Sequence, residues 1–114
     1  METLNEEVRI IDPDTGGEKG EKLERYDLLP WDVIDEDARL YGIGAKKYAE
    51  RNWERGYAWH LSFASLCHHL VAFWFFRERE DPVGKFHHLS AVRFHAAALM
   101  RFEREYPEKD DRPS

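Results

Sequence analysis

The sequence predicts an all-α fold of about three helices, completed by association of several copies of the chain. Apolar residues recur at helical spacing in three segments, Val, Ile and Thr are scarce after residue 34, and no segment alternates apolar and polar residues as a strand does. We expect one domain over residues 23–104, because residues 1–22 and 105–114 are polar, lack an apolar period and are typical of flexible arms.

The first predicted helix follows Pro30, since proline is favoured in the first turn of a helix. Its apolar stripe steps along the chain by four, three, four and three residues, through Ile34, Ala38, Tyr41, Ala45 and Tyr48. Gly42 and Gly44 each cost about 1 kcal/mol in a helix relative to alanine, so a bend or an early end is expected there.

The second helix is predicted from about Ala58 to Glu78, with Pro82 as the stop signal. Its segment "VAFWFF" is apolar on every side, and four consecutive aromatic residues, Phe73 to Phe76, cannot all face the core of so small a domain. Burial of the remaining rings against other copies of the chain predicts a homo-oligomer.

The third helix is predicted from about Lys85 to Tyr106 and ends before Pro107. Its core stripe consists of Leu89, Val92, Ala96 and Leu99.

Composition limits the function. A net charge of −6 disfavours polymeric nucleic acid as a partner, because phosphate would be repelled unless a local basic patch intervened. No run of 18 apolar residues is present, so no membrane partner is expected. One cysteine excludes an internal disulfide, and the acidic N-terminus lacks the profile of a signal peptide, so the expected location is the cytoplasm.

Two carboxylates stand near the end of the second predicted helix. Glu78 and Asp81 are three residues apart, a spacing that places both side chains near one face of a helix. Paired carboxylates are a usual way of holding Mg²⁺ or Mn²⁺. The alternative is that "RERED" before a proline is an ordinary solvated helix end.

Five of the six histidines fall between residues 68 and 95. His88 and His95 project in similar directions but lie about 10 Å apart along a helix, too far to chelate one ion directly. His68 and His69 are adjacent and point about 100° apart, so at most one is expected to face a given pocket. Without an HExxH or CxxC pattern, a structural zinc site is not predicted, and each histidine could also be capped or exposed.

The segment "GAKKYAERNW" combines cations with aromatic rings. Lys47 could meet phosphate oxygens, Asn52 a sugar hydroxyl or base edge, and Tyr48 or Trp53 could stack on a base. Alternatively, both aromatic side chains belong to the core and attach the first helix to the second.

Taken in order, "DLLPWDVI", "YGIGAKKYAERNW", "HHLVAFWFFRERED" and "HHLSAVRFHAAAL" resemble the N-terminal domain of the phage-associated dATP/dGTP diphosphohydrolase (MazZ-type) family. The resemblance covers residues 20 to about 100. This family is related to the MazG-like nucleotide pyrophosphohydrolases, which are all-α, commonly oligomeric, and hydrolyse the α–β phosphate bond with a divalent metal. The resemblance therefore implies a nucleotide substrate and a Mg²⁺ or Mn²⁺ cofactor.

Residue by residue, the resemblance implies three groups of site residues. Glu78, Asp81 and His88 are the expected catalytic residues, and Glu78 and Asp81 the expected metal ligands. The expected substrate-binding residues are Lys47, Tyr48, Asn52, Trp53, His69 and His95.

The chain also departs from the family pattern. His68 stands where arginine is usual, Arg77 where glycine is usual and His95 where asparagine is usual. MazG-like enzymes carry an ExxE pair on one helix and an ExxD pair on the next, whereas here only Glu78-Arg79-Glu80-Asp81 stands in a suitable place, and the third predicted helix offers His88 and His95 instead of carboxylates. Three hypotheses follow: metal-dependent hydrolysis of a purine deoxynucleoside triphosphate to the monophosphate and pyrophosphate, a nucleotide-binding or regulatory module without turnover, and a helical protein-interaction module.

Overall fold

The structure is a computed structural model that describes residues 8–114. The chain divides into two compact units, Met1–Pro30 and Trp31–Ser114. Each unit has its own secondary structure. The candidate site lies wholly within the second unit.

The first unit contains an antiparallel hairpin of strands β1 (Val8–Ile11) and β2 (Glu18–Glu21), with Val8 opposite Glu21. Its turn is closed by Asp12, whose carboxylate accepts the N–H groups of Asp14 and Thr15 at 2.8 and 2.9 Å. The polar composition of residues 1–22 predicts a flexible arm and does not indicate the hairpin, because four-residue strands are too short for a clear apolar alternation.

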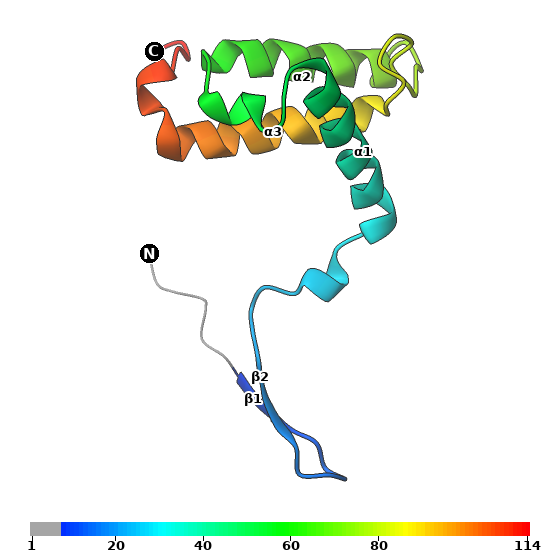
Figure 1. The fold of residues 1–114 in the computed structure, drawn as a ribbon, viewed down its shortest axis with the longest axis vertical. Coiled ribbons are helices and arrows are strands. Elements are labelled where there is room, and N and C mark those ends of the chain that lie inside the picture. The colour runs from blue at the N-terminus through cyan, green and yellow to red at the C-terminus, as the bar shows by residue number, and fades with distance from the viewer. Residues whose placement is uncertain (1–7) are drawn as a thin grey trace. The chain divides into compact units, whose positions relative to one another are not determined.

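The all-α prediction is confirmed: within residues 8–114 the second unit consists of helices α1 (Trp31–Lys47), α2 (Trp59–Trp74) and α3 (His88–Glu105), joined by loops and 3₁₀ turns (Figure 1). Helix α1 begins directly after Pro30, as predicted, and it continues through Gly42 and Gly44 without a break. Helices α2 and α3 lie side by side and run antiparallel, and α1 crosses them (Figure 1).

An aromatic core joins the start of α2 to the end of α3. The Phe102 ring is 0 % exposed, and the Trp59 indole Nε1–H donates to the Tyr106 carbonyl at 3.1 Å. Gly56 has a φ of 84° and lies against Tyr106, where an added Cβ would come within 2.8 Å of the ring, so only glycine fits. We call this group the aromatic core; its members are Trp53, Tyr57, Trp59, Ala98, Leu99, Phe102 and Tyr106.

The C-terminal residues return to the start of α2. After a 3₁₀ turn at Pro107–Lys109, Asp111 accepts the backbone N–H of His60 at 3.0 Å and also pairs with the His60 ring. The Arg112 guanidinium lies 4.8 Å from the centroid of the Trp59 ring. These contacts lie within residues 105–114, whose composition predicts a flexible tail.

The loop between α2 and α3, residues 75–87, is a compact hairpin. Helix α2 ends at Trp74, four residues before the predicted end at Glu78, and Arg77 takes a left-handed conformation with a φ of 55°. The chain then folds back on itself, so that the Asp81 N–H donates to Phe86 at 2.9 Å and the His88 N–H donates to Arg79 at 3.0 Å. This reversal brings the Glu78 carboxylate to His88 of α3 and the Asp81 carboxylate close to His68 and His69 of α2.

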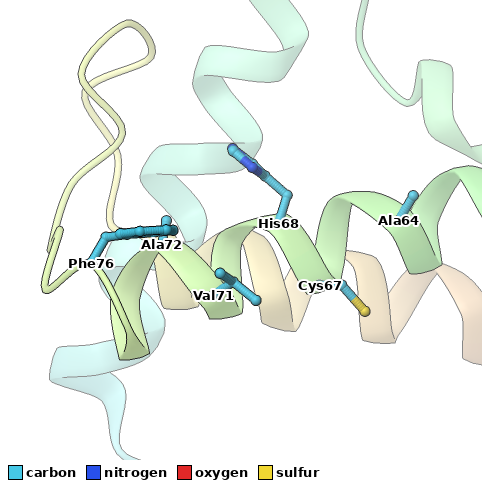
Figure 2. A pocket seen from close by; sticks show the side chains of 6 residues that line it. All are labelled: Ala64, Cys67, His68, Val71, Ala72 and Phe76. Atoms are coloured by element: carbon cyan, nitrogen blue, oxygen red, sulfur yellow. The ribbon is translucent and has the colours of Figure 1, made fainter.

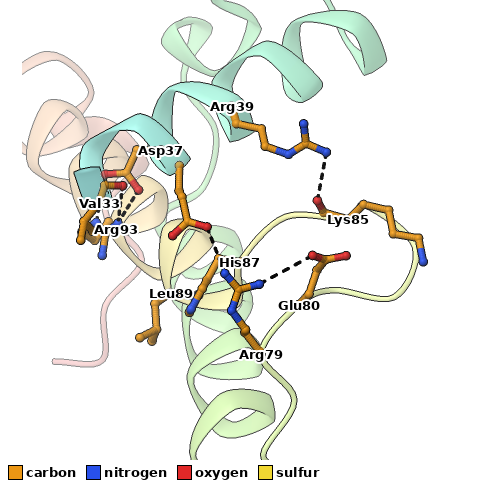
Figure 3. A network of polar contacts seen from close by, with 10 residues as sticks. Val33, Asp37, Arg39, Arg79, Glu80, Lys85, His87, Leu89 and Arg93 are labelled. Carbon is orange, nitrogen blue, oxygen red and sulfur yellow. Dashed lines mark hydrogen bonds and ion pairs between the residues drawn. The ribbon is translucent and has the colours of Figure 1, made fainter. Parts of the chain in front are cut away.

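Ion pairs attach α1 to this loop and to α3 (Figure 3). Arg93 of α3 donates two hydrogen bonds to the Asp37 carboxylate at 2.6 and 3.0 Å. Arg79 of the loop donates to Glu36 at 3.3 Å, and Arg39 donates to the Lys85 carbonyl at 3.4 Å. The loop is therefore attached to α1, which is itself attached to α3.

Candidate functional site

Four histidines gather where the second half of α2 passes the first half of α3. The ring centroids of His69 and His88 are 5.0 Å apart, those of His68 and His69 are 4.9 Å apart, and His69 stacks on His95 at 6.3 Å with an angle of 14°. We call these four side chains the histidine cluster. The loop adds Glu78 and Asp81 beside them.

A chain of hydrogen bonds runs through the buried part of the histidine cluster. The Glu78 carboxylate lies 2.6 Å from His88 Nε2, and His88 Nδ1 lies 2.8 Å from His69 Nδ1. His88 is fully buried, whereas the Glu78 side chain is 45 % exposed. The chain therefore leads from solvent at Glu78 to the imidazole of His69.

His68, His69 and Asp81 form a group that could hold a metal ion. Each offers one ligand atom, and these atoms lie within 4.8 Å of one another. Burial, followed by the nearby His88 and His68 rings, lowers the pKa of His69, so this imidazole is neutral near pH 7 and can offer a lone pair.

The Asp81 carboxylate is oriented by its own turn. Its Oδ1 accepts the N–H groups of Gly84 at 2.7 Å and Val83 at 3.0 Å, which leaves Oδ2 without a hydrogen bond inside the described chain. Burial acts to raise the pKa of Asp81, but the N–H groups of Gly84 and Val83 outweigh it and the net pKa is lowered. Asp81 is therefore ionised near pH 7 with one oxygen available.

Two expectations about this site were wrong. Glu78 and Asp81 do not share one face of a helix, because α2 ends at Trp74 and both residues lie in the loop. His68 and His69 both reach one site, although adjacent helical residues diverge, because a ring nitrogen of each lies within 4.8 Å of the other and of an Asp81 carboxylate oxygen. His68 was not among the predicted site residues; the signal that could have found it is its place where the family usually has arginine.

The fourth histidine belongs to a second hydrogen-bonded chain. His95 Nδ1 lies 3.0 Å from the hydroxyl of Ser62, and that hydroxyl lies 2.6 Å from the hydroxyl of Tyr57. Burial, and secondarily His69, lowers the pKa of His95 to about 4, so it is neutral near pH 7. Tyr48 is close enough to Tyr57 to contribute to the raised pKa of that phenol, which arises mainly from burial.

The other predicted substrate-binding residues lie on the segment between α1 and α2. Trp53 packs edge-on against Phe94, with ring centroids 5.8 Å apart, and lies 6.4 Å from Phe102, which is the arrangement that the core alternative predicts. Tyr48 is exposed, and the Lys47 ammonium lies 5.0 Å from its ring centroid. Asn52 is also exposed, and its side chain makes no hydrogen bond inside residues 8–114.

His68 also borders a shallow apolar pocket on α2 (Figure 2). The other lining side chains are Ala64, Cys67, Val71, Ala72 and Phe76. Beyond it, Trp74, Phe75 and Phe76 are 70 to 75 % exposed, so large aromatic rings face solvent beside the histidine cluster. Within residues 8–114, no helix is long and apolar enough to cross a membrane.

The fold and the site together define an all-α protein with a candidate histidine–carboxylate metal centre. Residues 13–112 match the family described as dATP/dGTP diphosphohydrolase, N-terminal, and the chain belongs to this family. The predicted resemblance is thereby confirmed. No curated protein and no solved structure matches the chain.

Proposed function

We propose that the protein hydrolyses a purine deoxynucleoside triphosphate to the monophosphate and pyrophosphate, with a divalent metal ion at the histidine cluster, in the cytoplasm. The observation that carries this proposal is the convergence of His68, His69 and Asp81 within 4.8 Å in a chain of this family. If the proposal is right, removing the metal ion with a chelator abolishes turnover.

The donor set distinguishes between the two expected metal ions. Two imidazoles and one carboxylate suit Mn²⁺ better than Mg²⁺, which prefers oxygen ligands and retains its waters. His68, His69 and Asp81 would hold the ion, and Glu78 is bonded to His88 instead. When bound, such an ion supplies Lewis acidity and lowers the pKa of a coordinated water.

Side chains of this chain would bind and orient the nucleotide. Within residues 8–114, Lys47 forms no ion pair, so its ammonium can bind phosphate oxygens, a charge-assisted contact worth about 1.5–3 kcal/mol. Asn52 and Tyr48 are exposed on the same segment and can meet the sugar or the base. By contrast, Arg79 and Arg93 are already paired with Glu36 and Asp37.

The alternative function is nucleotide binding without turnover. It is favoured because Glu78-Arg79-Glu80-Asp81 is the one carboxylate segment in a suitable place, whereas MazG-like enzymes carry an ExxE pair on one helix and an ExxD pair on the next. The test is a panel of ribo- and deoxynucleoside triphosphates with Mg²⁺ or Mn²⁺, followed by chromatography of the products. Monophosphate and pyrophosphate from dATP or dGTP support hydrolysis, whereas binding of intact nucleotide supports the alternative. If no nucleotide binds, both proposals are wrong and a helical interaction module remains.

We also propose that a second copy of the chain covers the exposed apolar face of α2, formed by Leu70, Val71, Trp74 and Phe75. Charged residues make up 35 % of the chain, yet none of Asp, Glu, Lys or Arg lies between Ala58 and Phe76, so two copies can pair here without burying charge. These side chains are 40 to 72 % exposed in the single chain.

Sedimentation tests this association. The wild-type chain is expected at twice the 13.6 kDa of one chain or more, and Trp74→Glu should reduce it to a monomer. Val83→Glu is the control, because Val83 is 90 % exposed and lies outside α2. A wild-type monomer at micromolar concentration would contradict the proposal.

A further inference from the structure

The hydrogen-bond chain through His88 restricts where each proton lies. An ionised carboxylate can only accept hydrogen bonds, so the 2.6 Å contact with Glu78 requires a proton on His88 Nε2. A neutral imidazole carries one N–H, so His88 Nδ1 is then an acceptor. The 2.8 Å contact between the two Nδ1 atoms consequently requires a proton on His69 Nδ1, and the lone pair of His69 is left on Nε2.

We propose that Glu78 and His88 are positioning residues that hold His69 in the tautomer whose Nε2 lone pair serves the metal site with His68 and Asp81. This inference rests on the proposed function, since it assigns a role in the same site. The sequence predicts Glu78 as a metal ligand, whereas the proposal assigns it an indirect role, in which it acts on the metal site through His88 and His69. His88 likewise acts through His69, because its own two ring nitrogens are both occupied.

The orientation of the His69 ring is fixed by packing as well as by the hydrogen bond. Phe86 lies edge-on to it at 5.6 Å, and His95 stacks on it at 6.3 Å. Phe86 can take this place because residue 84 is glycine; a Cβ there would come within 2.2 Å of the Phe86 ring. Aromatic contacts on two sides and one hydrogen bond leave the ring little freedom to turn.

A divalent ion at His69 would reinforce the same arrangement. The alternative is a doubly protonated His88, which would donate from Nδ1 and force His69 into the opposite tautomer. A positive charge on His88 so close to a metal dication is disfavoured by Coulomb repulsion. A hydrogen bond from the second nitrogen of a ligating histidine is a usual way in which proteins set its tautomer and raise metal affinity.

The first test reads the tautomer directly in the metal-free chain of residues 1–114. Long-range ¹H–¹⁵N correlation spectra of the imidazoles, recorded at about pH 8, above the ordinary pKa of histidine, report which ring nitrogen carries the proton. The expected result is a proton on Nδ1 of His69 and on Nε2 of His88. A proton on Nε2 of His69, or a doubly protonated His88, overturns the proposal.

The second test compares two glutamates of equal exposure. Glu78 and Glu80 are both 45 % exposed, but only Glu78 contacts His88, so Glu78→Ala is the variant and Glu80→Ala the matched control. Because Glu78→Ala removes the acceptor for the His88 Nε2–H, we expect it to weaken Mn²⁺ binding, measured by calorimetry without nucleotide, about 10- to 100-fold, with wild-type affinity in the control. Wild-type affinity in Glu78→Ala overturns the positioning role, and so does a wild-type chain that binds no Mn²⁺.

The two proposals fail separately. Turnover of dATP or dGTP together with unchanged Mn²⁺ affinity in Glu78→Ala would remove the positioning role and leave the function. The expected tautomer and affinity loss without any turnover would remove hydrolysis and leave the positioning role. Since the spectroscopic test uses the wild-type chain, it decides even if Glu78→Ala does not fold.

Discussion

At one end of the α2–α3 pair, Phe102 and Trp59 pack among aromatic rings, whereas at the other end His69 and His88 bond to each other and to a loop carboxylate. Both regions have completely buried side chains, yet their neighbours differ in kind. The aromatic core stabilises by removing apolar surface from water. In the histidine cluster, each buried polar atom instead needs a hydrogen-bond partner. These hydrogen bonds fix the geometry of the side chains more than they add to the free energy of unfolding.

The comparison predicts that substitutions in the aromatic core affect folding more than ligand binding. Phe102→Ala removes a side chain that is 0 % exposed, so we expect a loss of about 3–5 kcal/mol in the free energy of unfolding. Urea denaturation measures it. Met100→Ala is the control on the same helix, because Met100 is 73 % exposed. A loss below about 1 kcal/mol for Phe102→Ala would mean that this region does not form the core.

The reverse outcome is expected at the histidine cluster. Asp81→Asn removes a proposed metal ligand, but the asparagine carbonyl can still accept the N–H groups of Val83 and Gly84. We therefore expect Mn²⁺ affinity and turnover to fall at least about 100-fold while the melting temperature changes little. Calorimetry and thermal melts measure both, and full activity in Asp81→Asn would remove it from the site.

The difference between the two regions also explains which features the sequence could predict. Helical periodicity is a local property, so the three helices were predicted within a few residues of their observed limits, apart from the end of α2. That end depends on the left-handed conformation of Arg77, a residue type that rarely adopts it, and Pro82 is a stop signal that lies inside the loop.

The sequence indicates which residues belong to the site but not which of them contact one another. It predicts Glu78, Asp81, His69 and His88 as site residues, and the structure places them together. Their hydrogen-bond partners depend on how the loop between α2 and α3 folds back, and residue spacing in the sequence does not contain this information. For the same reason, the pairing of His88 with Glu78 and the approach of Asp81 to His68 could not be predicted.

The pH dependence of stability should distinguish the two regions again. His95 has a pKa of about 4 in the folded chain and about 6.5 when unfolded, so the unfolded state binds more protons between these values. Stability is therefore complete above about pH 6.5 and is lost as the pH falls toward 4, by at most about 3 kcal/mol from this residue.

His95→Asn should make this acid loss smaller, because asparagine does not titrate and can keep the hydrogen bond to Ser62. Chemical denaturation of both proteins at about pH 4.5 and about pH 7 measures the effect. Met100→Ala should follow the wild type, because Met100 is exposed and carries no titratable group. An identical acid loss in His95→Asn would assign it to other groups.

The smallest expected effect concerns how each region handles positive φ angles. The aromatic core uses Gly56 at a φ of 84°, whereas the histidine cluster is approached through Arg77 at 55°, where the family pattern has glycine. A left-handed conformation costs a residue with a side chain about 1–2 kcal/mol, and glycine avoids this cost but loses about 0.5–1 kcal/mol through the greater freedom of the unfolded chain. Arg77→Gly should therefore stabilise the chain slightly, by about 0.5–1 kcal/mol, raising the melting temperature by a few degrees.

Arg104→Gly is the matched control inside α3, where glycine should lower the melting temperature instead. If Arg77→Gly destabilises the chain as much as the control does, Arg77 is not held in the left-handed conformation, and the loop that carries Glu78 and Asp81 does not begin where the structure places it.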